Sequence, residues 1–214
     1  RRCDMQRRLI HFALHFLILF IVLVQPSTKA FAAVPDPVDQ FRPFLDKVTA
    51  VLADPNLKKL PKKEQCQRVI AVVRERFDFR EMSKRVVGQH WRELNNQEQD
   101  QFEELFTQLL QYAYVGKIDE YSGQKVEFGQ KRIKGERAEV QTLLVDKNRS
   151  IPVSYILLLH DDQWMAYDVV VEGVSLVRNY MEQFKEILQK EGHSGLIQQI
   201  QAKISQLEQQ NKQS

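Results

Sequence analysis

The segment YDVVVEGVSLVRNY, residues 167–180, joins two kinds of secondary structure and decides the fold. Its three consecutive valines, residues 169–171, point to alternating faces of a strand, so both faces carry aliphatic side chains. A Glu-Gly pair at 172–173 interrupts the strand, and apolar residues then recur at helical spacing from Val174 to Tyr180. The segment therefore predicts a strand that passes directly into a helix, with more apolar surface than a simple turn requires.

The hydrophobic period changes twice along the chain. A helical period covers about residues 37–122 and returns over 174–207, where Gly192 interrupts the last helix. Between these parts, residues 124–172 alternate with a period of two and predict four strands joined by short turns, an antiparallel meander. Helices, then a meander, then helices are typical of an α+β fold. A curved four-stranded sheet crossed by helices resembles the nuclear-transport-factor-like and cystatin-like folds, which commonly enclose an apolar pocket.

Two helix starts carry capping residues. Asp78 and Glu81 form a D-x-x-E pattern that predicts the start of a short helix ending at Gly88. Asn95 or Asn96 is expected to cap a long helix that reaches roughly residue 121.

The N-terminal residues have the features of a cleaved signal peptide. Basic residues follow Met5, an apolar run covers residues 11–24, and Ala30 and Ala32 form an A-x-A cleavage site. The apolar run is shorter than the roughly 20 residues of a membrane span, although an uncleaved anchor remains the alternative. We expect residues 1–32 to be a signal peptide with upstream residues, 33–210 a single domain and 211–214 a tail.

Removal of residues 1–32 changes the charge of the chain. The whole chain has a formal charge of +3, but this segment holds five basic residues and one acidic residue, so the remainder is at about −1. Nucleic-acid binding thereby loses its main electrostatic argument. Cys66 is the only cysteine left, which excludes an internal disulfide, and its spacing with Val69, Ile70 and Val73 predicts a small buried core residue.

No catalytic motif stands out in the sequence. His90, His160 and His193 lie in separate elements without metal-ligand spacing, and neither a G-x-S-x-G elbow nor a G-x-x-x-x-G-K phosphate loop occurs. Asp168 and Glu172 are candidates for an acid pair, because a buried carboxylate can act as a general base. The alternative is that Asp168 bonds backbone or an arginine and that Glu172 helps to cap the following helix.

Five segments in sequence order carry a resemblance to a known family. They are FDFREMSKRVVGQHW (77–91), FEELFTQLL (102–110), EYSG (120–123), IPVSY (151–155) and WMAYDVVVEGVSLVRNYMEQFKEIL (164–188). Together they resemble the MlaC family of periplasmic phospholipid-binding proteins, also called toluene-tolerance auxiliary proteins. The match extends over about residues 38–204, and residues 167–180 are its most specific part.

This resemblance implies a function and partners. A family member is expected to be no enzyme and to need no cofactor, but to carry glycerophospholipid as cargo in an apolar pocket. It would shuttle lipid through the periplasm of Gram-negative bacteria, between an outer-membrane lipoprotein–porin complex and an inner-membrane ABC transporter with an MCE-domain subunit. The pathway maintains outer-membrane lipid asymmetry. The residues expected to line the pocket are Val86, Trp91, Leu109, Tyr112, Tyr155, Val169, Val171 and Val174.

Two other functions stay open from the residues alone. One is an enzyme on the same cone-shaped fold that uses Asp168 or Glu172, which requires a carboxylate inside the pocket. The other is an envelope interaction module without a ligand, whose apolar residues all serve as core. The carrier hypothesis requires instead a deep apolar pocket without catalytic groups.

Overall fold

The structure, a computed structural model, describes residues 34–114, 116–147 and 149–213. The expected signal peptide lies outside these residues and stays a prediction. Pro35 onward forms one compact unit, to which the following description applies. None of the helices in the described ranges has the length and apolar character needed to cross a membrane.

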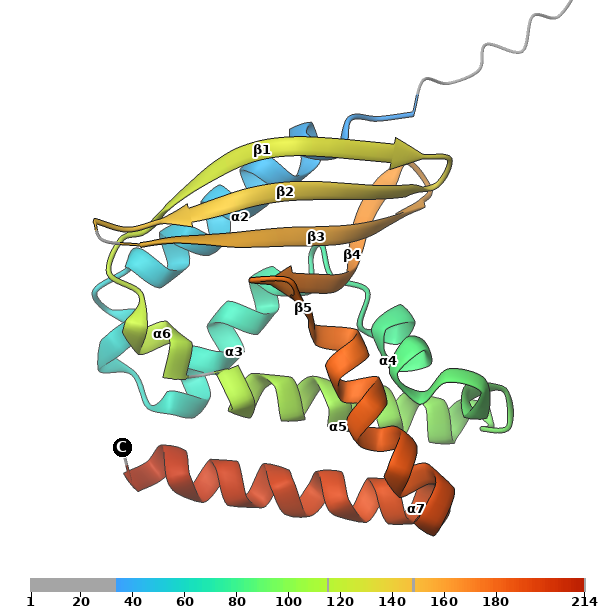
Figure 1. The fold of residues 1–214 in the computed structure, drawn as a ribbon. Coiled ribbons are helices and arrows are strands. Elements are labelled where there is room, and N and C mark those ends of the chain that lie inside the picture. Colours follow the sequence, from blue (N-terminus) through green and yellow to red (C-terminus); the bar gives the residue numbers. More distant parts are fainter. Residues whose placement is uncertain (1–33, 115, 148, 214) are drawn as a thin grey trace, which may run out of the picture. The chain divides into compact units, whose positions relative to one another are not determined.

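The sheet is an antiparallel meander in which sequential strands are neighbours (Figure 1). Its strands are β1 (Lys125–Lys134), β2 (Arg137–Val145), β3 (Ser150–His160), β4 (Gln163–Val171) and β5 (Val174–Ser175). The α+β class and the four long strands agree with the sequence-based expectation. The two-residue strand β5 is additional: it pairs with the end of β4 across the turn at Glu172 and Gly173.

A bulge interrupts the alternation of side chains along β4. Strict alternation would place Tyr167 and Val169 on one face of the sheet and Asp168 on the other. The register instead pairs Ala166 with Leu157 but Asp168 with Ile156, so Tyr167 is the extra residue of a bulge. Both Tyr167 and Asp168 are buried at the bulge, shortly before the chain enters its last helix.

Helix α2 (Pro37–Ala53) covers one face of the sheet (Figure 1). Asp36 caps it by accepting a hydrogen bond from the Val38 backbone N–H, and Pro37 fits the first turn because that position needs no N–H donor. Its apolar face packs on the sheet in one of the cores. Buried residues of this core are Phe41, Phe44, Leu45, Val72, Ala138, Val140, Leu157, Trp164 and Ala166.

The remaining helices before the sheet are η1 (Leu57–Lys59), α3 (Lys62–Val73), α4 (Phe79–Val87), η2 (Gly88–Arg92), α5 (Asn96–Tyr114) and α6 (Gly116–Glu120). Helices α4, η2 and α5 carry buried residues of a second core, whereas Leu57, Cys66 and Ile118, on η1, α3 and α6, form a smaller third core. Both predicted caps are confirmed: Asp78 accepts from the Glu81 N–H at 2.8 Å, and Asn95 accepts from the Glu98 N–H at 3.0 Å. The Glu98 carboxylate accepts in return from the Asn95 N–H at 2.9 Å, which completes a capping box.

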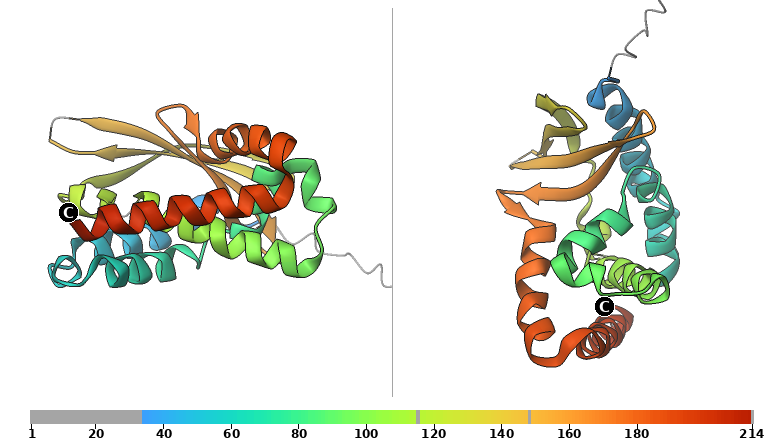
Figure 2. Two further views of the ribbon diagram at one scale, coloured as in Figure 1. Left: turned by 90° about the horizontal axis from the view of Figure 1, so that it is seen from below. Right: turned by 90° about the vertical axis from the view of Figure 1, so that its right-hand side faces the viewer.

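Helix α7 (Leu176–Gln213) consists of two helices that meet at Gly192. Gly192 has φ 68° and ψ −168°, a backbone conformation that is essentially restricted to glycine. The chain turns there, and the second half of α7 runs beside α5 (Figures 1 and 2). Leu196 and Ile200 are buried in a core shared with α4 and α5, so the turn at Gly192 is what brings this half back onto the protein.

Substitution of Gly192 tests this turn. Gly192→Ala should lower the free energy of unfolding by about 1–3 kcal/mol, because alanine is strained in that backbone conformation. Urea denaturation measures the change, and Ser194→Ala, at an exposed position two residues on, is the matched control. Equal stability of the two variants would contradict the proposed strain.

Candidate functional site: an apolar cavity beside helix α3

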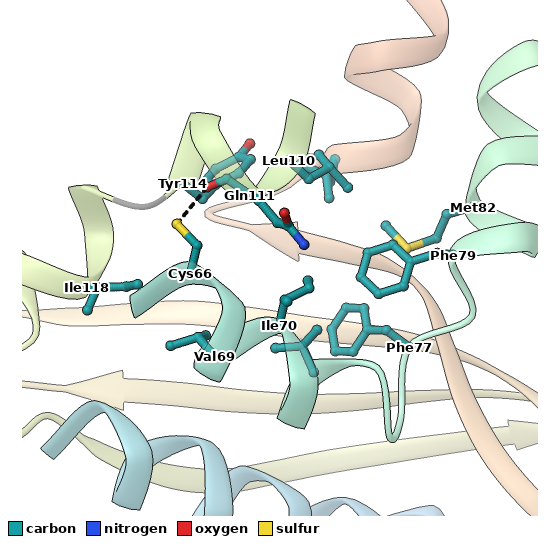
Figure 3. A pocket seen from close by; sticks show the side chains of 12 residues that line it. Cys66, Val69, Ile70, Phe77, Phe79, Met82, Leu110, Gln111, Tyr114 and Ile118 are labelled. Carbon is teal, nitrogen blue, oxygen red and sulfur yellow. Dashed lines mark hydrogen bonds between the residues drawn. The ribbon is translucent and has the colours of Figure 1, made fainter. Parts of the chain in front are cut away.

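A cavity of about 250 Å³ lies among α3, α4, α5, α6 and the start of α7 (Figure 3). The twelve side chains around it include no Asp, Glu, Lys, Arg or His. They are Cys66, Val69, Ile70, Val73, Phe77, Phe79, Met82, Leu110, Gln111, Tyr114, Ile118 and Leu176. A space of this size and chemistry favours a hydrocarbon ligand over a polar one, because polar groups would leave water without replacement hydrogen bonds.

Helix α3 explains why the cavity is not closed. It has apolar residues on more than one side: Val72 is buried in the core next to α2, whereas Ile70 and Val73 face the cavity and stay half-buried. Side chains around an unfilled space lack contact partners on that side and lose the corresponding dispersion energy. Filling the cavity with an apolar ligand would restore these contacts.

The segment from Arg76 to Asp78 fixes one end of the cavity to the sheet. The Asp78 N–H donates to the Ala166 carbonyl at 2.8 Å, and the Ala166 N–H donates to the Arg76 carbonyl at 2.7 Å. Phe77, held between these bonds, has its ring centroid 6.3 Å from that of Phe79 and 6.1 Å from that of Phe44. Phe77 thus belongs both to the cavity wall and to the contact between the two cores.

Cys66 contributes a thiol to the cavity wall, as a buried residue in agreement with the sequence-based expectation. Its sulfur lies 3.9 Å from the Gln111 carbonyl oxygen, the contact drawn in Figure 3. Burial raises the pKa of this thiol to about 11. The group is therefore protonated and uncharged at neutral pH, which keeps this side of the wall apolar.

Asp168 has a structural role at the start of α7. Its Oδ1 accepts hydrogen bonds from the backbone N–H groups of Val169 at 2.8 Å and Val177 at 3.0 Å. Its Oδ2 accepts from the Ser175 hydroxyl at 2.6 Å. The carboxylate thus ties the β4 bulge to the first turn of α7, which confirms the alternative that Asp168 bonds backbone. Glu172, expected to help cap this helix, is instead paired with Arg149.

The other polar candidates do not gather into a site. Glu172 forms an exposed ion pair with Arg149 at 2.9 Å, and neither Glu172 nor Asp168 lines the cavity. The histidines lie apart: His90 is 2.9 Å from Glu93, His160 is 3.4 Å from Asp78, and His193 packs beside Phe102. Within the described ranges, no cluster of His, Cys, Asp and Glu is suited to hold a metal ion.

The predicted lipid-binding residues on the helices lie in the second core. Val86, Trp91 and Leu109 are buried there, and Tyr112 is half-buried against it. None of the four lines the cavity beside α3, although Leu109 lines a different cavity between α5 and α7. Their contact with lipid stays a prediction.

The predicted residues on the strands are more dispersed. Tyr155 packs in the core under α2, where burial raises its pKa to about 12. Val169 is half-buried, whereas Val171 and Val174 are 42% and 62% exposed. The structure therefore places the two valines on the surface near the β4–β5 turn and away from the cavity wall, and their role in lipid binding is likewise still untested.

None of the eight predicted lipid-binding residues is among the twelve that line this cavity. The spacing of Cys66 with Ile70 and Val73 predicts core residues, because a helical apolar period is the same for a residue that faces a core and one that faces a cavity. One signal was present. Helix α3 has apolar residues beyond the single stripe that one packing face requires, and this surplus marks the cavity side.

Removal of the Asp168 carboxylate should cost stability. Asp168→Ala should lower the free energy of unfolding by about 2–3 kcal/mol, because it leaves the buried Val177 N–H and the Ser175 hydroxyl without their acceptor. Glu172→Ala is the matched control, and its exposed ion pair should be worth less than about 1 kcal/mol. A wild-type urea midpoint for Asp168→Ala would contradict the capping role.

Reactivity of Cys66 should report on the cavity wall. The thiolate is the nucleophile, so a pKa of about 11 should make alkylation at neutral pH on the order of a hundredfold slower than for an exposed cysteine. The rate with iodoacetamide should continue to rise as the pH approaches 11. A rate that levels off near pH 9, as for a free thiol, would show that the sulfur is solvated.

Comparisons with known proteins identify the family of the chain. The family model described as "MlaC protein" matches residues 43–202. A Haemophilus influenzae protein, named intermembrane phospholipid transport system binding protein MlaC, is 23% identical over 128 residues, which cover 57% of this chain and 60% of that protein. A phospholipid-binding protein from Ralstonia solanacearum, solved in complex with a phospholipid, has the same fold at 23% identity. Its TM-score is 0.73, and the match covers 81% of this chain and 99% of that one. Because the family model spans most of the described residues, the chain belongs to the MlaC family.

Proposed function

We propose that the protein is a phospholipid carrier and that the cavity beside α3 holds acyl chain. The uncharged, apolar wall of this cavity is the observation that carries the proposal. Membership of the MlaC family supports it, as does the name of the Haemophilus influenzae relative, which describes a binding protein of an intermembrane phospholipid transport system. The phospholipid in the Ralstonia solanacearum structure gives further support.

The proposal extends to location and partners. The signal-peptide features of residues 1–32 favour export, and the carrier would work in the periplasm of a Gram-negative bacterium. It would exchange lipid with an outer-membrane lipoprotein–porin complex and with an inner-membrane ABC transporter that has an MCE-domain subunit. Through this exchange it would maintain the lipid asymmetry of the outer membrane.

The energetics of such cargo favour handover from partner to partner. Two acyl chains contain about 30 methylenes, and burial of each is worth roughly 0.8 kcal/mol. The gross gain of about 24 kcal/mol exceeds the strongest known affinities, before the costs of ordering the lipid reduce it. Spontaneous release into water would therefore be very slow, so the lipid would leave against a membrane or a partner that opens the cavity.

The proposal does not include catalysis. An enzyme on this fold that used Asp168 or Glu172 would need one of these carboxylates in the cavity, next to the substrate. Asp168 instead accepts hydrogen bonds from the start of α7, and Glu172 pairs with Arg149 at the surface. These positions favour a carrier over an enzyme that uses either carboxylate.

Native mass spectrometry tests the carrier function. The mature protein, purified from a bacterial periplasm without detergent, should carry a stoichiometric adduct with the mass of a two-chain phospholipid, because a lipid with so much buried hydrocarbon dissociates slowly. Organic extraction and lipid analysis would then identify its head groups. A lipid-free mass together with an empty extract would contradict the proposal.

A pair of variants on α3 tests where the lipid binds. Ile70→Gln places an amide in the cavity wall and should reduce lipid occupancy roughly tenfold, since the unpaired amide is costly against hydrocarbon. Ala71→Gln, at the adjacent exposed position, is the matched control and should keep full occupancy. Full occupancy in both variants would place the lipid elsewhere, and Val171→Gln would then test the surface near the β4–β5 turn.

A further inference from the structure

The cavity beside α3 is too small for the whole hydrocarbon part of the proposed cargo. A cavity of ~150 Å³ accommodates benzene, which corresponds to roughly 25 Å³ for each carbon atom. By this measure the cavity of about 250 Å³ holds on the order of ten carbons. A two-chain phospholipid carries about 30 methylenes, so most of its hydrocarbon needs space elsewhere. This inference rests on the proposed carrier function.

A second and larger cavity lies between α5 and the two halves of α7. Its volume is about 510 Å³, room for about twenty carbons on the same measure. The floor is apolar, and amide side chains and one lysine form the rim. The residues around it are Leu109, Ala113, Tyr180, Gln183, Phe184, Ile187, Gln199, Ile200, Ala202, Lys203, Gln206 and Leu207.

The same two helices form walls of both cavities. On α5, Leu110 and Tyr114 line the first cavity, whereas the preceding neighbours of each, Leu109 and Ala113, line the second. On α7, Leu176 lines the first cavity, and Tyr180, one turn later on the same side of the helix, lines the second. The two spaces are therefore adjacent across the contact between α5 and the first half of α7.

Tyr180 occupies this contact. Its ring centroid lies 5.2 Å from that of Phe106 and 5.6 Å from that of Phe184. Burial raises the pKa of the Tyr180 hydroxyl to about 12, and the neighbouring Tyr114 adds to the effect. Tyr180 lines the second cavity one helical turn after Leu176, which lines the first, so Tyr180 lies at the boundary between the two spaces.

We propose that the cavity between α5 and α7 is a second acyl-chain subsite, which receives the distal carbons of the lipid, and that the Tyr180 ring is the partition between the two cavities. Rotation of this side chain joins the spaces, which together have room for about 30 carbons, close to the content of two chains. Lys203 suits the rim, because its stem covers apolar surface while its ammonium stays in water and bonds the Gln206 amide at 3.1 Å.

Photo-crosslinking of the wild-type chain tests the subsite directly. The probe is a phosphatidylglycerol with two palmitoyl chains and a diazirine at the end of one chain, loaded into the lipid-free protein. Peptide mass spectrometry should find crosslinks to α5 and to both halves of α7, for example at Phe184 and Ile200. Crosslinks confined to α3, α4 and α6 would overturn the second subsite.

A filled subsite provides the complementary test. Ala202→Trp introduces an indole into the second cavity from an exposed position, and Gln201→Trp, on the same helix but outside the cavity, is the matched control. Ala202→Trp should bind dipalmitoyl phosphatidylglycerol about tenfold more weakly, the effect of roughly two methylenes left unburied. Binding of a single-chain decanoyl lysophospholipid, which fits the first cavity alone, should not change.

The outcomes separate this inference from the proposed function. A wild-type protein that binds neither lipid contradicts the carrier function itself. A wild-type protein that binds both, with unchanged affinity for the dipalmitoyl lipid in Ala202→Trp, overturns only the second subsite. If Ala202→Trp does not fold, as circular dichroism would reveal, the crosslinking of the wild-type chain decides.

Discussion

Two backbone hydrogen bonds at Ala166 hold the helical part of the protein to its sheet. They join Arg76 and Asp78 to β4. Phe77, the residue between these two, contacts both cores. Helices α3 and α4 leave this anchor in different directions, so their apolar faces do not meet and a cavity is left between them (Figure 3). The carboxylate of Asp168, two residues further along β4, fixes the start of α7.

The cavity between the anchored helices has an energetic cost for the lipid-free protein. A domain gains stability from close packing, and side chains around an empty space forgo part of that gain. Here the lining is mostly hydrocarbon with an uncharged thiol, and it includes no Asp, Glu, Lys, Arg or His. Such a site gains free energy from an apolar chain and none from a polar substrate. On the proposed function, the same property that weakens the lipid-free protein makes the cavity selective for acyl chains.

The sequence predicted the class of fold well because that information is local. The helical period, the alternation over residues 124–172 and the caps at Asp78 and Asn95 all agree with the structure. The sequence did not identify the cavity wall, because a cavity forms where the side chains of neighbouring helices do not contact one another. Local sequence patterns do not show where such contacts are absent. The bulge at Tyr167 shifts one side of β4 by a residue, a displacement that period-two reasoning cannot anticipate. Val171 and Val174 are exposed where they pair with each other beside the turn between β4 and β5.

A crystal structure of the protein purified without detergent tests the central claim most directly, since it shows whether hydrocarbon fills the space beside α3. The account predicts continuous electron density for an acyl chain within van der Waals distance of Ile70, Met82 and Leu110. A cavity closed by the contact of these three side chains with one another, with no density between them, would contradict it.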